Sequence, residues 1–149
     1  MEQAKIEVKD LYKIFGSNPK KGLKMAKEGI SKEDILDRTG MTVGVQDASF
    51  SINSGEIFVV MGLSGSGKST IVRMLNRLIE PTAGQVLVDG NDVTKMDHDE
   101  LVKFRLSTMS MVFQSFALMP HLTVLENAAF GLELAGVEKR KHKERAGQA

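Results

Sequence analysis

Hydrophobic and polar residues alternate along the N-terminal part of the chain in the manner of half-buried strands. Ile6 and Val8 stand among charged residues, and apolar and polar residues alternate over 48–52. The run Gln-Val-Leu-Val at 85–88 is followed by Asp-Gly, a pair typical of a tight turn. These patterns predict a small antiparallel β-sheet.

A second hydrophobic pattern occupies residues 56–61. This run, Glu-Ile-Phe-Val-Val-Met, is short, almost wholly apolar and partly β-branched, as is typical of a parallel strand covered on both faces. After a glycine-rich segment, apolar residues recur at helical spacing from Ile71 to Ile79, and Pro81 is expected to end that helix. The order is therefore a buried strand, a loop and a helix.

Residues 17–42 interrupt the strand pattern and predict an inserted helical hairpin. Pro19 opens a lysine-rich helix that ends near Gly29, and Ser31 is suited to cap a second helix that stops before Gly40. The hairpin is either a regulatory or partner-contacting element or a solvated decoration, and the sequence leaves both interpretations open.

The last third of the chain predicts two helices and a short strand. Residues 99–106 fit a helix, and the apolar run 110–113 fits a strand that ends at Gln114. Thr123 followed by Glu126 matches a capping box at the start of another helix.

Composition restricts the functional classes. The 149 residues include 42% hydrophobic residues and no cysteine, which suits an intracellular globular protein without disulfides. No apolar run approaches the roughly 20 residues that a membrane-spanning helix needs. The net charge of +1 gives no strong field for nucleic acid, and the basic cluster 139–143 is interpreted as a solvated helix face. The three histidines lack the spacing of metal ligands.

The segment between the predicted strand 56–61 and the helix fits G-x-x-x-x-G-K-[ST], a phosphate-binding loop. Its glycines allow backbone conformations in which N–H groups converge on phosphate oxygens. We expect Lys68 to reach the β- and γ-phosphates and the Ser69 hydroxyl to ligate Mg²⁺. A flexible Gly/Ser loop is the alternative, which the strand and helix context disfavours. The predicted nucleotide-binding residues are Gly62, Leu63, Ser64, Gly65, Ser66, Gly67, Lys68, Ser69 and Thr70.

This loop, the Gln114 segment and Thr-Val-Leu-Glu-Asn at 123–127 together resemble the ATP-binding subunits of ATP-binding cassette transporters. The resemblance implies an α/β P-loop NTPase fold, of which the chain is the N-terminal portion of one domain. Residues 17–42 are then a helical insertion, 43–115 the antiparallel β-subdomain with the P-loop strand and helix, and 116–149 the start of the helical subdomain. The insertion and the segments 73–78 and 111–121 are similar to the glycine betaine/proline importers of bacteria.

The resemblance also assigns roles to single residues. Phe15 stands where the family places the aromatic ring that stacks on adenine, although a core position at a strand end is the alternative. Gln114 matches the glutamine that contacts Mg²⁺ and the attacking water, so the implied catalytic residues are Lys68 and Gln114 and the implied metal ligands Ser69 and Gln114. The apolar stretch 116–121 resembles the surface that receives a permease, with burial in the protein's own core as the alternative.

The function implied by the resemblance is an ATP-binding, energy-coupling subunit of an osmoprotectant importer. Its cofactors are ATP and Mg²⁺, and it lies at the cytoplasmic face of the membrane through a permease. A second ATP-binding subunit and, indirectly, a substrate-binding protein are further partners, and no nucleic acid is expected.

After His121 the sequence has no Leu-Ser-Gly-Gly-Gln signature, no Walker B strand and no switch histidine, so we expect this chain alone to be deficient in ATP hydrolysis. Two alternatives to the importer subunit remain. The first is a non-catalytic nucleotide-binding fragment or truncated product without transport activity. The second is another P-loop kinase or GTPase. The absence of Asn-Lys-x-Asp and of an arginine-rich lid disfavours the kinase or GTPase.

Overall fold

The computed structural model describes residues 4–115 and 118–148. Two compact units emerge, Met1–Leu101 and Val102–Ala149, and each is described by itself. Among the described residues, every helix is too short or too polar to cross a membrane.

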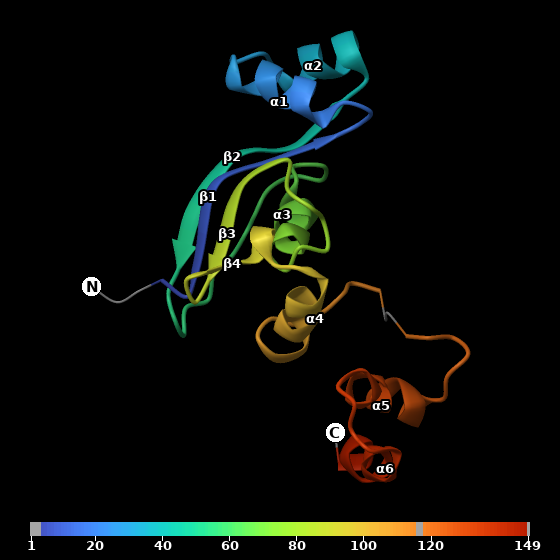
Figure 1. The fold of residues 1–149 in the computed structure, drawn as a ribbon. Helices are drawn as coiled ribbons and strands as arrows, with labels where there is room; N and C mark the ends of the chain where they lie inside the picture. Colours follow the sequence, from blue (N-terminus) through green and yellow to red (C-terminus); the bar gives the residue numbers. More distant parts are fainter. Residues whose placement is uncertain (1–3, 116–117, 149) are drawn as a thin grey trace. The chain divides into compact units, whose positions relative to one another are not determined.

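The first unit is built on a four-stranded sheet with the order β2-β1-β3-β4, in which all neighbouring strands are antiparallel (Figure 1). This confirms the antiparallel sheet predicted from the alternating pattern. Ile6 in β1 pairs with Ile52 of β2 on one side and with Val88 of β3 on the other, so the predicted strand segments around 48–52 and 85–88 flank β1. The strands are β1 (Ile6–Phe15), β2 (Thr42–Ile52), β3 (Ala83–Val88) and β4 (Asn91–Asp92).

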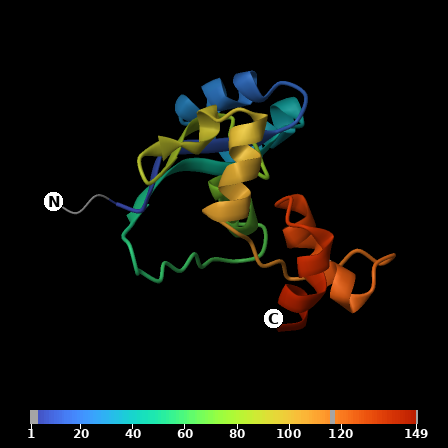
Figure 2. The same cartoon turned by 60° about the horizontal axis from the view of Figure 1, so that its bottom comes forward.

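The predicted helical hairpin is confirmed as α1 (Pro19–Lys27) and α2 (Lys32–Thr39). The Ser31 hydroxyl accepts a hydrogen bond from the Asp34 N–H (3.0 Å), and Gly40 closes α2 in the left-handed conformation (φ 68°). Both helices lie next to one end of β1 and β2, as Figure 1 shows, and Figure 2 shows the same fold turned by 60°. They pack there through one buried cluster, which consists of Tyr12, Ile14, Ala26, Ile35, Met41 and Val43.

The parallel strand predicted over residues 56–61 is wrong for this structure, because the segment is irregular and largely open to solvent. Ile57 and Met61 are 90% and 85% exposed, whereas Val60 is half-buried and Phe58 stacks on Phe50 with ring centroids 4.8 Å apart. A strand needs neighbours for its N–H and C=O groups. No strand of the described residues pairs with 56–61, so its apolar pattern alone does not make it a strand.

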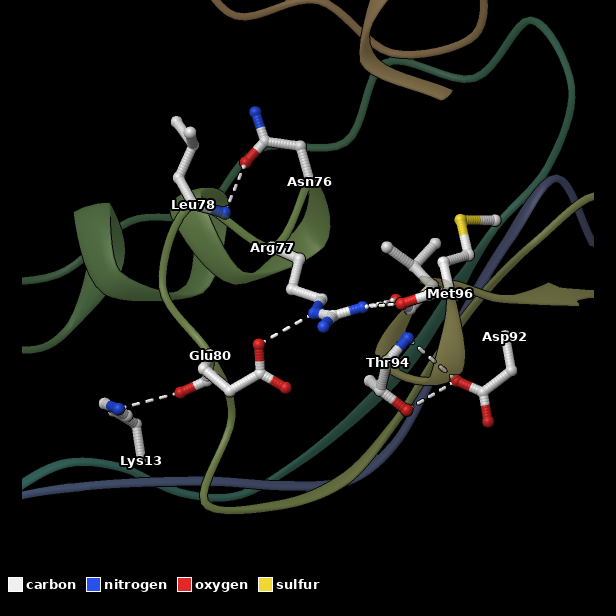
Figure 3. Close-up of polar contacts among 9 residues, drawn as sticks. Lys13, Asn76, Arg77, Leu78, Glu80, Asp92, Thr94 and Met96 are labelled. Carbon is white, nitrogen blue, oxygen red and sulfur yellow. Dashed lines mark hydrogen bonds and ion pairs between the residues drawn. The ribbon is translucent and has the colours of Figure 1, made fainter. Parts of the chain in front are cut away.

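The helix after the glycine-rich loop, α3 (Lys68–Leu75), is shorter than predicted. It ends at Leu75, well before Pro81, with Asn76 as the C-cap residue, because Arg77 takes a left-handed conformation (φ 54°) that no α-helix continues through. Asn76 is buried, and its Oδ1 accepts a hydrogen bond from the Leu78 N–H (Figure 3). A short 3₁₀ helix, η1 (Val93–Lys95), follows the β4 strand.

The remaining helices are α4 (His98–Ser107), α5 (Val124–Leu134) and α6 (Lys139–Gln148). The capping box predicted at the start of α5 is confirmed: Glu126 Oε2 accepts from the Thr123 N–H (2.8 Å), and the Thr123 hydroxyl accepts from the Glu126 N–H (3.3 Å). The strand predicted over 110–113 is wrong, since this segment is irregular and Val112 is 98% exposed. As with residues 56–61, none of the described strands pairs with residues 110–113, so their apolar pattern does not lead to a strand.

Candidate functional site

The glycine-rich loop takes the backbone conformations that its sequence predicts. Gly62, Gly65 and Gly67 have φ angles of 155°, 78° and 92°, a region that residues with a β-carbon rarely adopt. The loop is closed by a hydrogen bond from the Ser66 N–H to the Leu63 carbonyl (3.2 Å). These glycines therefore shape a tight, exposed loop that leads directly into α3.

The start of α3 differs from the starts of α1, α2 and α5. Those helices begin with a side chain that accepts a backbone N–H, whereas Gly67 at the start of α3 has no side chain to offer. The first intrahelical bond runs from the Ile71 N–H to the Gly67 carbonyl (2.9 Å), so the N–H groups of residues 68–70 have no intrahelical acceptor. Together with the positive end of the helix dipole, they form a local environment that favours an anion.

Lys68 adds a positive charge to this loop. Its Nζ donates to the Leu63 carbonyl (2.6 Å) and lies 3.5 Å from the Ser66 Oγ, so the side chain folds back over the loop. Ser69, in the first turn of α3, is exposed. The backbone N–H groups and the Lys68 ammonium suit phosphate oxygens. The accessible Ser69 hydroxyl oxygen is the kind of ligand that a hard cation such as Mg²⁺ prefers.

Phe15 and the loop meet at one residue of β2. A β-carbon built on Gly44 would lie 2.6 Å from Phe15 Cε2, and one built on Gly67 would lie 2.2 Å from the Gly44 carbonyl oxygen. The Phe15 ring is 40% exposed at the end of β1, so it is not buried in the core. Gly44 was not among the predicted site residues, although an isolated glycine inside a strand is a signal of close backbone approach.

Lys13 holds a position beside the Phe15 ring. Its Nζ lies 5.1 Å from the ring centroid, within the range of a cation–π contact, and donates to the Glu80 carbonyl (2.7 Å; Figure 3). The ring therefore has a cation as one neighbour and the β2 backbone as another.

Gln114, the remaining predicted site residue, belongs to the second unit and lies in its exposed, irregular segment. Of the apolar stretch 116–121, Phe116 and Ala117 lie outside the described residues, while Leu118 and Met119 are 62% and 38% exposed. Leu118 and Met119 line an apolar cavity of about 400 Å³ together with Pro120, Leu122, Val124, Asn127 and Ala128.

Asn127 organises the turn before α5. Its Oδ1 accepts from the Met119 N–H (2.8 Å), and its Nδ2 is within hydrogen-bond distance of the carbonyls of Met119, Leu122 and Thr123 (3.0–3.2 Å). The Thr-Val-Leu-Glu-Asn segment thus caps α5 and also shapes the loop that precedes it. Within the described part of the chain, no group of three or more acidic or histidine side chains is arranged to hold a metal ion.

A family model described as ABC transporter matches residues 45–149, which include the glycine-rich loop, Gln114 and α5. The chain belongs to the ABC transporter family. The match and the solved structures below show that the fold is that of part of an ATP-binding cassette. The ABC transporter chain is 60% identical over 142 residues to the glycine betaine/proline betaine transport system ATP-binding protein ProV of Escherichia coli. It is 56% identical over 142 residues to the glycine betaine transport ATP-binding protein OpuAA of Bacillus subtilis.

These two alignments cover 95% of this chain but only 36% and 34% of the relatives, so the chain spans about a third of their length. Solved structures agree on the fold. A dimeric bacterial ABC transporter cassette superposes with a TM-score of 0.75 at 28% identity, covering 96% of this chain and 54% of that one. An ATP-binding cassette in a dimeric post-hydrolysis state bound to ADP and Pi gives a TM-score of 0.74 at 27% identity, with the same coverage.

Proposed function

We propose that this chain is the nucleotide-binding part of an ATP-binding subunit that couples ATP hydrolysis to uptake of glycine betaine or a proline-type osmoprotectant. The observation that carries the proposal is the loop before α3, where three glycines with positive φ, an uncapped helix start and Lys68 come together. The choice of solute rests on the relatives, which are named for glycine betaine transport.

Each site residue has a distinct part in this proposal. The backbone N–H groups of residues 62–70 bind the phosphates, and Lys68 leaves the Leu63 carbonyl to contact the β- and γ-phosphates. Ser69 would hold Mg²⁺, which supplies charge neutralisation between the phosphates when it is bound. Phe15 would stack on the base, and Gln114 would orient the attacking water and supply a ligand to Mg²⁺, the roles that the family resemblance implies for them.

The proposed partners follow from the same family. They are a transmembrane permease, a second ATP-binding subunit and, through the permease, a substrate-binding protein, and the subunit lies at the cytoplasmic face of the membrane. The exposed apolar cavity beside Leu118 and Met119 is the surface proposed to receive the permease.

The proposal includes very slow hydrolysis by these 149 residues alone, because the sequence has no Walker B carboxylates and no signature to position water and neutralise charge. Phosphate release should be measured for the chain alone and in the presence of purified permease subunits. Rapid release by the chain alone would contradict this part. Nucleotide binding with no release under either condition would instead support a non-catalytic fragment.

Calorimetric titration with Mg-ATP tests the nucleotide site. Lys68→Ala removes the charged donor and should weaken binding about 10- to 100-fold, as expected for one or two charge-assisted hydrogen bonds. Lys20→Ala, at an exposed position of α1, is the matched control and should bind like the wild type. Equal Mg-ATP affinity in the wild type and the Lys68 variant would refute the assignment of the loop.

A further inference from the structure

Glycine is needed at position 44 because a β-carbon there would have no space, and not because of the backbone conformation. Its φ lies outside the left-handed region, so the backbone would accept alanine. A β-carbon there would nevertheless lie 2.6 Å from Cε2 and 3.2 Å from Cδ2 of Phe15, whereas the next atom, the Lys13 carbonyl oxygen, is at an ordinary 3.5 Å. The conflict is thus confined to one aromatic ring, which can rotate away without unfolding the sheet.

The ring has little freedom to move while its present contacts are kept. The Lys13 ammonium lies 5.1 Å from the ring centroid and is anchored to the Glu80 carbonyl at 2.7 Å. A methyl group on Gly44 would push the ring out of this arrangement.

The same glycine also contacts the phosphate loop. A β-carbon on Gly67 would lie 2.2 Å from the Gly44 carbonyl oxygen, so the end of the loop packs directly on the backbone of β2 at this point. A single residue of β2 therefore adjoins both the aromatic ring and the residue that opens α3.

We propose that Gly44 is the positioning residue that holds the Phe15 ring at the place and spacing from the phosphate loop needed to stack on the base of a nucleoside triphosphate. This inference rests on the proposed function. Replacing Gly44 with alanine displaces the platform for the base and leaves the loop that binds the phosphates in place, because alanine keeps the carbonyl that Gly67 contacts.

The test compares Mg-ATP with Mg-tripolyphosphate, which offers phosphates but no base. Phe15→Ala is expected to weaken Mg-ATP binding about 5- to 150-fold, the range for loss of one stacked base. Gly44→Ala is expected to weaken Mg-ATP at least about fivefold while Mg-tripolyphosphate changes by less than about twofold. Gly131→Ala, in open space on α5, is the matched control and should leave both affinities unchanged.

The double variant Phe15→Ala/Gly44→Ala completes a double-mutant cycle with the two single variants. It should bind Mg-ATP no more weakly than Phe15→Ala alone, because the ring through which Gly44 acts is gone. If Gly44→Ala lowers the melting temperature, the double variant should recover it relative to Gly44→Ala, since removing the ring frees the space. Failure of that recovery would overturn the inference.

Other outcomes separate the two hypotheses. Normal Mg-ATP binding by Gly44→Ala, with weakened binding by Phe15→Ala, would overturn the role of Gly44 and leave the proposed function intact. Equal loss of Mg-ATP and Mg-tripolyphosphate would also overturn it, because Gly44 would then act through the loop or the fold. A wild-type chain that binds neither ligand would overturn the proposed function and this inference with it.

Discussion

Arg77→Ala is expected to destabilise the first unit by about 2–4 kcal/mol. Arg77 lies two residues after the last residue of α3, in a left-handed conformation, and its guanidinium contacts other segments of the chain (Figure 3). Nη1 donates to the carbonyls of Val93 (3.1 Å) and Met96, and Nε donates to the Glu80 carboxylate (2.7 Å). The side chain therefore links the end of α3 to η1.

The magnitude follows from how each contact is buried. The Arg77 side chain is only 20% exposed, and a hydrogen bond to a charged group contributes about 1.5–3 kcal/mol. Because one nitrogen serves both carbonyls, we expect the two bonds together to contribute less than twice that range. The Glu80 side chain is 59% exposed, so its ion pair adds less than about 1 kcal/mol. The left-handed backbone remains in the alanine variant and does not change the difference.

Urea unfolding followed by far-ultraviolet circular dichroism measures this loss, with the slope of the transition as a check on two-state behaviour. Arg77→Lys keeps the charge but lacks the planar fork, and should lose about half as much free energy of unfolding. Arg73→Ala removes an exposed arginine from the same helix and serves as the control. A free energy of unfolding of Arg77→Ala within about 0.5 kcal/mol of the wild-type value would refute this role of Arg77. An equal loss of free energy of unfolding in Arg73→Ala would also refute it.

Two further predictions concern the helical segments. Ile35→Ala, which removes a fully buried side chain between α2 and the sheet, should cost about 2–5 kcal/mol in urea unfolding, whereas Leu36→Ala, at a 47% exposed position, should cost less than about 1 kcal/mol. A similar loss in both variants would contradict that packing. Hydrogen bonds from the Thr123 hydroxyl and N–H lower the pKa of Glu126 below its ordinary value of 4.5. Because the folded-state pKa is the lower one, the capping stabilisation of α5 is present above pH 4.5 and is lost as the pH falls through the folded-state pKa, as NMR titration of the carboxyl and the helical signal should show. A Glu126→Gln variant should lack this pH dependence, and an unshifted titration would disprove the capping argument.

Local sequence signals located most of the helices and turns of this ABC transporter chain. The hairpin of α1 and α2, with Ser31 at a start and Gly40 at an end, and the capping box at Thr123 were all predictable. Each depends on hydrogen bonds and backbone conformations within a few neighbouring residues. The phosphate-loop sequence belongs to the same class, because its glycines and Lys68 act over one loop and one helix start.

Three features depended on contacts between distant parts of the chain. Residues 56–61 have the composition of a buried strand, yet none of the described strands pairs with them. Helix α3 stops early where Arg77 finds carbonyls that are 16 and 19 residues away in sequence. The contact of Gly44 with Phe15 and Gly67 arises only when β1, β2 and the loop come together. Sequence by itself determined the short-range structure and the family. Tertiary contacts decided the strand pairing, the end of α3 and the neighbours of Phe15, because a strand or an aromatic ring is positioned by atoms that lie far away along the chain.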